Sequence, residues 1–157
     1  MKKILVNVAD LVIGKKGEIV IQSMTNTPTT NIEATYNQCV ALSKAGAQLV
    51  RVTTQGIKEV EALAKIKQRL REDGIETPLV ADVHFSYNIA HAAARVADKV
   101  RINPGNFAKE PNVAKRELSK LITICKEYKT SLRIGVNHGS MGEYNTLKYG
   151  NSPAGMA

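Results

Sequence analysis

Short β-branched stretches alternate with longer amphipathic stretches along this chain, and that alternation limits the possible folds more than any other feature. The predicted strands start about 20 to 33 residues apart. They run over residues 18–23, 48–53, 79–84, 99–103 and 131–137. Strands joined by helix-length connections pair in parallel, because a crossover must carry the chain back beside the previous strand. We therefore predict an α/β fold with about five parallel strands, preceded by a short N-terminal hairpin over residues 4–13.

Apolar residues between these strands recur at helical spacing, which predicts a helix in each connection. We expect the first helix to begin at a capping box made by Thr30 and Glu33. The later helices are expected over about residues 57–73, 87–97 and 113–128. The last of these should have one apolar face, which consists of Leu118, Leu121, Ile122 and Cys125.

Polar side chains lie near the carboxyl end of four of the predicted strands. Residues two or four apart in a strand point to the same side of the sheet. The pairs that share a side are Arg51 with Thr53, Asp82 with His84, Arg101 with Asn103, and Arg133 with Asn137. Because the carboxyl ends of parallel strands lie at one edge of a sheet, we predict that these side chains meet in a single site.

Two architectures contain such runs of βα units: a doubly wound open sheet and a (β/α)8 barrel. A dinucleotide-binding open sheet would carry a Gly-x-Gly-x-x-Gly motif after its first strand, and none follows here. Polar residues instead follow several strands, which is typical of a barrel. Since a complete barrel usually needs about 250 residues, we predict that residues 1–157 form the N-terminal portion of a partial TIM-like (β/α)8 barrel domain.

The polar residues at the strand ends are suited to an anion with several oxygen atoms. A guanidinium group offers a rigid fork of N–H donors that matches phosphate, and three forks in one pocket would suit a diphosphate. His84 could donate to a phosphate or act as a general acid, while Asn103 and Asn137 could orient hydroxyl groups. The glycines that flank Asn137 would let backbone N–H groups approach an anion closely.

A purely structural interpretation of the same residues remains open. Arg51 and Asp82 could form an ion pair between neighbouring strands, while Arg101 and Arg133 extend to solvent. Three arginines inside strands are difficult to place in an ordinary core, because each buried charge needs a partner. We therefore favour the binding site over the structural interpretation.

No metal site is predicted in this chain. Asp82 and His84 have no third ligand at metal-binding spacing. Cys39 and Cys125 each fall in an apolar helical pattern, and neither has a Cys or His partner at ligand spacing. We expect both to be buried thiols, with a disulfide between them as the less favoured alternative.

Composition and charge limit the classes of partner. The net charge of +8 favours anionic partners such as phosphorylated metabolites. Aromatic residues make up 4% of the chain and are not interleaved with Arg and Lys, so nucleic-acid binding is not predicted. No stretch reaches the roughly 20 apolar residues of a membrane helix, and no membrane association is predicted. We expect a cytoplasmic location in a bacterium or a location in the plastid stroma.

Five motifs follow one another in an order that resembles a known family. They are residues 22–27 (QSMTNT), 50–56 (VRVTTQG), 78–85 (PLVADVHF), 99–106 (KVRINPGN) and 133–140 (RIGVNHGS). Together they resemble the 4-hydroxy-3-methylbut-2-enyl diphosphate synthases, the IspG or GcpE family. Residues 149–156 resemble the next motif of that family, so the likeness spans about residues 4–157.

The resemblance implies a TIM-like barrel joined to a C-terminal iron–sulfur domain that is absent from this chain. The family opens the ring of 2-C-methyl-D-erythritol 2,4-cyclodiphosphate by reduction, in the non-mevalonate pathway of isoprenoid (terpenoid) biosynthesis. A [4Fe-4S] cluster held by three cysteines and a glutamate supplies electrons from ferredoxin or flavodoxin, and the enzyme is a homodimer. Neither Cys39 nor Cys125 matches a cluster ligand, so this chain alone is expected to be inactive.

Carried onto matching positions, the resemblance assigns roles to the strand-end residues. Those expected to bind the diphosphate are Arg51, His84, Arg101 and Arg133. Those expected to line the pocket and orient the substrate at the catalytic centre are Asp82, Asn103 and Asn137. The alternative function is another phosphate- or pterin-binding TIM-barrel transferase. A lysine at a strand end would favour an aldolase, but Lys99 starts its strand.

Overall fold

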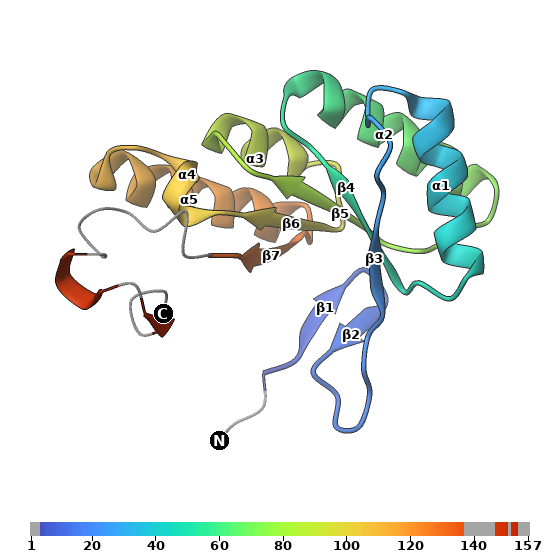
Figure 1. Cartoon of the computed structure of the whole chain (residues 1–157), viewed down its shortest axis with the longest axis horizontal. Helices are drawn as coiled ribbons and strands as arrows, with labels where there is room; N and C mark the ends of the chain where they lie inside the picture. The colour runs from blue at the N-terminus through green and yellow to red at the C-terminus, as the bar shows by residue number, and fades with distance from the viewer. Residues whose placement is uncertain (1–3, 137–146, 151, 154–157) are drawn as a thin grey trace.

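A five-stranded parallel sheet forms the centre of the protein, in a computed structural model that describes residues 4–136, 147–150 and 152–153. Its strands follow one another in chain order (Figure 1). They are β3 (Gln22–Met24), β4 (Leu49–Thr53), β5 (Leu79–Val83), β6 (Lys99–Ile102) and β7 (Ser131–Ile134). The antiparallel hairpin of β1 (Val6–Val8) and β2 (Leu11–Ile13) precedes them. This arrangement confirms the predicted hairpin and five parallel strands.

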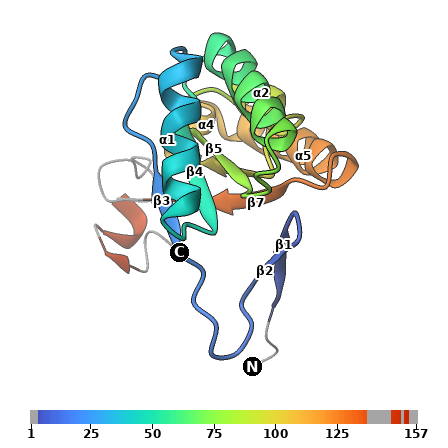
Figure 2. The same cartoon turned by 90° about the vertical axis from the view of Figure 1, so that its right-hand side faces the viewer.

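The helices that connect the strands cover one face of the sheet (Figures 1 and 2). They are α1 (Ile32–Lys44), α2 (Ile57–Glu72), α3 (Tyr87–Ala93), the short α4 (Pro104–Phe107) and α5 (Pro111–Glu127). A doubly wound sheet would reverse its strand order and place helices on both faces. Consecutive order with helices on one face is instead the winding of a barrel, so the open-sheet alternative is excluded.

The main core lies between these helices and the convex face of the sheet. Alternate strand residues such as Val50, Val52, Ala81 and Val100 are fully buried there. Fully buried Leu63, Ile66 and Leu70 of α2 pack into the same core, as their helical spacing predicts. Because successive strand residues point to opposite faces, the residues between them line the concave face.

Several details of the helices differ from the sequence predictions: α3 ends at Ala93 instead of about residue 97, and the short α4 was not predicted as a helix. Helix α1 is capped by Asn31, whose side chain accepts a hydrogen bond from the backbone N–H of Ala34 at 3.1 Å, so the Thr30 capping box was wrong. The acid expected in that box, Glu33, instead pairs with Arg69 of α2. An ion pair with another helix thus replaces the local hydrogen bond that the sequence pattern predicted.

Helix α5 also presents a slightly different face from the one predicted. Its buried residues are Glu117, Leu121, Ile124 and Cys125, which lie on one stripe at helical spacing. Ile122, predicted on the same apolar face, lies beside this stripe and is 41% exposed. The sequence did not suggest a buried glutamate there, but Arg116 and Lys120 both donate to the Glu117 carboxylate.

The N-terminal hairpin packs on the concave side, where it covers the amino-terminal end of the strands. Val8 is fully buried against Leu49 and Val80, whose side chains point to the concave face at that end. The Ser131 hydroxyl of β7 donates to the backbone carbonyl of Asn7, so the hairpin is also joined to the last described strand. The hairpin therefore closes the bottom of the partial barrel and leaves the carboxyl ends of the strands free.

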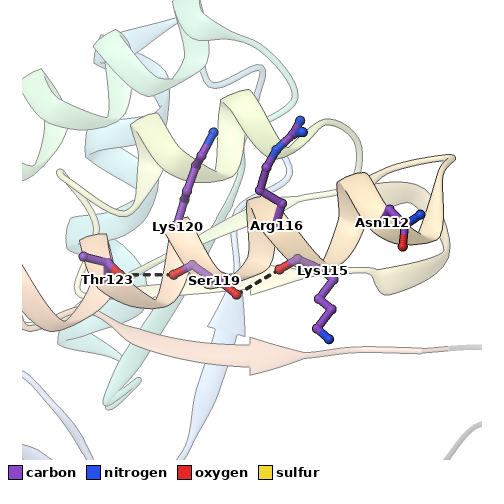
Figure 3. Close-up of a pocket in the computed structure, with 6 residues that line it drawn as sticks. All are labelled: Asn112, Lys115, Arg116, Ser119, Lys120 and Thr123. Atoms are coloured by element: carbon purple, nitrogen blue, oxygen red, sulfur yellow. Dashed lines mark hydrogen bonds between the residues drawn. The ribbon is translucent and has the colours of Figure 1, made fainter.

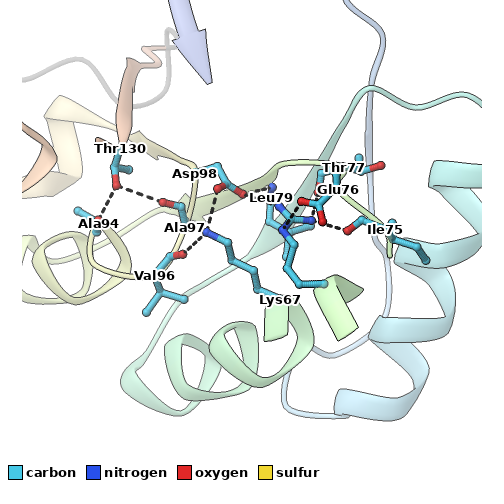
Figure 4. Close-up of polar contacts among 11 residues, drawn as sticks. Lys67, Ile75, Glu76, Thr77, Leu79, Ala94, Val96, Ala97, Asp98 and Thr130 are labelled. Atoms are coloured by element: carbon cyan, nitrogen blue, oxygen red, sulfur yellow. Dashed lines mark hydrogen bonds and ion pairs between the residues drawn. The ribbon is translucent and has the colours of Figure 1, made fainter. Parts of the chain in front are cut away.

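A polar network fixes the helix side of the same amino-terminal end (Figure 4). The Asp98 carboxylate accepts from Lys67 Nζ and from the backbone N–H of Leu79, each at 2.8 Å. Arg71 Nη2 lies 3.6 Å from the same carboxylate. These contacts tie α2 to the starts of β5 and β6.

Within the described ranges, no helix is long and apolar enough to cross a membrane.

Candidate anion-binding site

A row of polar residues crosses the concave face near the carboxyl ends of the strands. The strand register pairs Thr53 with Asp82, Asp82 with Arg101, and Arg101 with Arg133. Arg51 lies on the same face of β4, two residues before Thr53, in register with Val80. Parallel pairing in register therefore places side by side the residues that the sequence pattern put on one side of each strand.

Asp82 is the centre of this row. Its side chain is 0% exposed and contacts two guanidinium groups and an imidazole. Arg51 Nη2 lies 2.5 Å from Oδ2, His84 Nε2 lies 2.8 Å from Oδ2, and Arg101 Nη1 lies 3.2 Å from Oδ1. One buried carboxylate thus holds the side chains of two arginines and a histidine in a single cluster, and its charge offsets only part of theirs.

Arg51 retains an unused donor within this cluster. Its Nε–H is buried and has no hydrogen-bond partner among the described residues, while Nη2 is committed to Asp82. A buried donor without a partner is costly, so its presence points to an acceptor that is supplied from elsewhere. The Arg51 side chain is 22% exposed, which leaves such an acceptor a route of approach.

Arg101 is held from two sides. Its Nη1 donates to Asp82 on β5, and its Nη2 donates to the backbone carbonyl of Gly135, just beyond β7, at 3.4 Å. The side chain is 12% exposed. The guanidinium group, which β6 contributes, is therefore held between β5 and the segment that follows β7.

The remaining predicted site residues are placed less centrally. Arg133 is exposed and lies next to Arg101 in the register. Asn103 is 5% exposed, and its side-chain oxygen accepts from the backbone N–H of Gly105, which caps α4. Asn137 and the following His138 lie outside the described residues. The structure thus brings Arg51, Asp82, His84 and Arg101 into direct contact, with Arg133 beside them.

The structural interpretation is partly correct, because the Arg51–Asp82 ion pair exists. It is wrong for Arg101, whose guanidinium group contacts the same carboxylate instead of extending to solvent. Two arginines around one acid leave a net positive charge, and Arg133 adds another. Such an arrangement attracts a polyvalent anion and offers it several N–H donors.

Lys99 is a cationic residue of this face that the sequence analysis did not assign to the site. It is 9% exposed and lies on the same face of β6 as Arg101, two residues before it. Burial is the main cause that lowers the pKa of its ammonium group, and the positive charge of Arg133 lowers the pKa further. Its spacing of two residues from Arg101 could have placed it on this face. It was not assigned because it starts its strand, whereas the site was expected at the strand ends.

Two hollows adjoin the described surface, and only one lies at the carboxyl edge of the sheet. A cavity of about 380 Å³ is lined by residues 25–30, Thr53, Gln55 and Glu59, beside the end of β4. A hollow of about 510 Å³ lies along the outside of α5 (Figure 3). There Ser119 and Thr123 donate their hydroxyls to backbone carbonyls of their own helix, and Arg116 and Lys120 both donate to the Glu117 carboxylate, so most of its donors already have partners.

The described residues do not form a site for an iron–sulfur cluster. No group of three His, Cys, Asp or Glu in the described ranges is placed to hold a metal ion. Cys39 and Cys125 are buried free thiols on α1 and α5, as predicted. Burial raises the pKa of Cys39 to about 11, which disfavours the thiolate that a metal requires.

Comparison with known proteins gives a consistent family assignment. A family model described as the GcpE TIM-barrel domain matches residues 3–157. The chain is 45% identical to the 4-hydroxy-3-methylbut-2-en-1-yl diphosphate synthase (flavodoxin) of Bacteroides fragilis strain YCH46, over 96% of this chain and 27% of that protein. It is 41% identical to the protein of the same name from Chlamydia trachomatis serovar L2, over 99% of this chain and 29% of that protein. The chain thus spans less than a third of the length of these relatives.

Proposed function

Because the chain belongs to the family of GcpE TIM-barrel domains, we propose that it supplies the diphosphate-binding half of a 4-hydroxy-3-methylbut-2-en-1-yl diphosphate synthase. The substrate would be 2-C-methyl-D-erythritol 2,4-cyclodiphosphate, whose ring is opened by reduction. The relatives that carry this name are about 41–45% identical to nearly the whole chain. On the same basis we propose that the activity is that of an oxidoreductase of isoprenoid biosynthesis.

The observation that carries the proposal is the cluster around Asp82. A fully buried carboxylate holds Arg51, His84 and Arg101 at the carboxyl edge of a parallel sheet, where barrel enzymes bind their substrates. The arginines are therefore positioned before the ligand arrives, so little side-chain entropy is lost on binding. The unused Nε–H of Arg51 is a donor suited to a phosphate oxygen.

We assign roles to the site residues on this basis. Arg51, His84, Arg101 and Arg133 would bind the diphosphate. Asp82 would orient the first three of these side chains. Asn103 and Asn137 would line the pocket and orient the hydroxyl groups of the substrate, with the Asn103 side chain also holding the start of α4.

The redox half of the reaction would come from elsewhere in a longer polypeptide. We propose that a C-terminal iron–sulfur domain holds a [4Fe-4S] cluster in the complete protein, and the relatives, of which this chain covers 27–29%, are long enough to contain such a domain. Flavodoxin, which the relatives' name includes, or ferredoxin would donate the electrons. A homodimer and a bacterial cytoplasmic location complete the proposal, the latter because the relatives named above are bacterial.

Calorimetric titration of the complete protein with the cyclodiphosphate tests the binding role. Arg101→Ala should weaken binding by about 1.5–3 kcal/mol, which is the usual contribution of a hydrogen bond to a charged group. Arg116→Ala is the matched control, because Arg116 lies on the outside of α5 with its side chain 63% exposed. Equal affinity of wild type and Arg101→Ala would contradict the assigned role.

Turnover of the cyclodiphosphate by the anaerobically reconstituted complete protein, with a reductant, tests the reaction itself. Formation of 4-hydroxy-3-methylbut-2-enyl diphosphate is the expected result. Binding of the cyclodiphosphate without turnover by a fully reconstituted protein would favour the alternative, another phosphate- or pterin-binding barrel transferase.

A further inference from the structure

Gly135 lies against the Arg101 guanidinium group more closely than any other residue type would allow. A Cβ atom at Gly135 would lie 2.6 Å from Arg101 Nε, 3.2 Å from Nη2 and 3.4 Å from Cζ. Real Cβ contacts do not come below 3.0 Å, so a side chain at this position and the observed Arg101 conformation exclude each other. The absence of a side chain is therefore what gives Arg101 its room.

Other reasons for a glycine do not apply here. Gly135 is not among the residues with positive φ, so backbone conformation does not require it. Its N–H donates to the backbone carbonyl of Ile102 at 2.9 Å, which continues the β6–β7 pairing. That N–H is consequently not available to an anion, although the sequence pattern suggested that use for the glycines of this segment. What remains is the carbonyl of Gly135, which accepts from Arg101.

We infer that Gly135 is a positioning residue for anion binding, which acts by holding the Arg101 guanidinium group between its own carbonyl and the Asp82 carboxylate. This inference rests on the proposed binding role of Arg101. The contacts on the two sides come from different neighbouring strands, β5 and the end of β7, so together they define the direction of the side chain. Any side chain at Gly135 would push the guanidinium group out of this position.

The contact also predicts which property changes. The atoms that a methyl group would meet all belong to a side chain, and Arg101 can rotate away without disturbing the sheet. Gly135→Ala should therefore leave folding largely intact while it moves Arg101 away from Asp82. A glycine needed only for packing would show the opposite, a loss of stability with unchanged affinity.

A double-mutant cycle in the complete protein tests the inference, with calorimetric affinity for both inorganic pyrophosphate and the cyclodiphosphate as the readout. Gly135→Ala should weaken binding about tenfold or more, as Arg101→Ala does. In the Arg101→Ala background, Gly135→Ala should change affinity less than twofold. An equal loss in both backgrounds would overturn the inference, because the methyl group would then obstruct the pocket directly.

Gly56→Ala provides the matched control. A Cβ at Gly56 would also meet a side chain closely, Glu59 Oε2 at 2.8 Å, but it does not touch Arg101. This variant should bind both ligands as the wild type does in either background. A loss of affinity equal to that of Gly135→Ala would show that any methyl group near the strand ends has the same effect, which would overturn the inference.

The crystal structure of the unliganded Gly135→Ala protein gives a test that depends on no ligand. The Arg101 guanidinium group should have left Asp82, with the path of β7 unchanged. An Arg101 that keeps its contact with Asp82 would overturn the inference whatever the affinities are. If the wild type binds pyrophosphate but not the cyclodiphosphate, the proposed substrate fails while the Gly135–Arg101 coupling is still measured.

Discussion

Asp82 contributes to the site by arranging cations, and the energetic cost of burying it explains why its partners stay in place. An isolated carboxylate without exposure would be strongly unfavourable, and its contacts with Arg51, His84 and Arg101 offset that cost jointly, so that loss of any one contact still leaves two. The arginines in turn avoid mutual repulsion because the carboxylate lies between them. Binding residues and folding residues are therefore the same at this point.

Replacement of this carboxylate should destabilise the protein. Asp82→Asn leaves two partly buried arginines without their counter-charge, and we expect the free energy of unfolding to fall by about 3 kcal/mol, the lower end for a broken buried pair because both arginines keep some exposure. Added pyrophosphate should raise the melting temperature of the variant more than that of the wild type, since the anion takes over the missing charge. Thermal unfolding with and without pyrophosphate measures both effects.

Asp98→Asn is the control for this prediction. It removes a carboxylate that is 11% exposed and also accepts from a lysine, but at the opposite end of the strands. This variant should be destabilised, while its response to pyrophosphate stays that of the wild type. An equal response of the two variants would show that pyrophosphate does not act at the Asp82 cluster.

Lys99 adds positive charge near the site but lowers the stability of the protein. Because burial and Arg133 lower its pKa, the unfolded chain holds the proton more tightly than the folded protein does. Its contribution to stability is therefore unfavourable below the folded pKa. That contribution should become less unfavourable as pH rises from the folded pKa to the unfolded value near about 10.4.

Lys99→Met should therefore stabilise the protein and weaken the site. We expect a gain of about 1 kcal/mol at neutral pH, the lower end for replacing a buried ion with an apolar side chain, and a flatter pH dependence of stability in the alkaline range. Urea unfolding across pH measures both, and pyrophosphate affinity should fall because one positive charge is lost. Lys115→Met, at an exposed position of α5, should change neither; a loss of stability in Lys99→Met would contradict the argument.

At the scale of elements, the two ends of the strands perform different tasks. The amino-terminal ends carry the hairpin and the Asp98 network, which hold helices and strands together. The carboxyl ends carry the Asp82 cluster and the polar cavity beside β4. Apart from Lys99, whose charge acts on the site from the start of β6, changes at the amino-terminal ends should affect stability without affecting anion binding, as is usual for barrel folds.

Val8 tests this separation. Its side chain is fully buried against Leu49 and Val80, one row below the Asp82 cluster. Val8→Ala should lower the free energy of unfolding by about 1–2.5 kcal/mol, through lost burial and a small cavity, while pyrophosphate affinity stays unchanged.

Val6→Ala is the matched control for Val8→Ala. Val6 lies in the same strand of the hairpin but is 37% exposed, so it should cost distinctly less stability. Equal destabilisation of the two variants, or a lower pyrophosphate affinity of Val8→Ala, would contradict the view that the hairpin closes the amino-terminal end of the barrel and affects stability alone. Urea unfolding and calorimetry on the same preparations make the comparison.

At the scale of the whole molecule, the sheet ends in two open edges. β3 and β7 each pair with one strand only among the described residues. Large apolar side chains lie exposed near both edges, with Ile21 and Ile134 each 58% exposed. An open edge with apolar neighbours favours pairing with further strands, which in a complete barrel would be the remaining strands.

The 157-residue chain expressed alone should therefore associate with itself. We expect its mean mass in solution to rise with concentration, because unpaired strand edges form intermolecular hydrogen bonds. Light scattering after gel filtration, over about a tenfold range of concentration, measures this. The complete protein should keep a constant mass over the same range, and a strictly monomeric 157-residue chain would show that its edges are protected.

The sequence by itself determined the alternation of strands and helices, the parallel sheet, and the side of each strand on which the polar residues lie. These follow from local rules, since side-chain direction alternates with residue number in a strand and repeats every 3.6 residues in a helix. The placing of Arg51, Asp82 and Arg101 on one face needed no further information. The likeness of its motifs to a known family then suggested the anion that we propose.

Only the tertiary structure decided which of these residues meet. That Asp82 contacts Arg51 and Arg101 at once, that Gly135 lies against Arg101, and that Lys99 is buried all depend on the register between strands. Register is set by contacts between residues far apart in the chain, which no local pattern contains. For the same reason Asn31 replaced the predicted cap of α1, where Glu33 pairs with another helix.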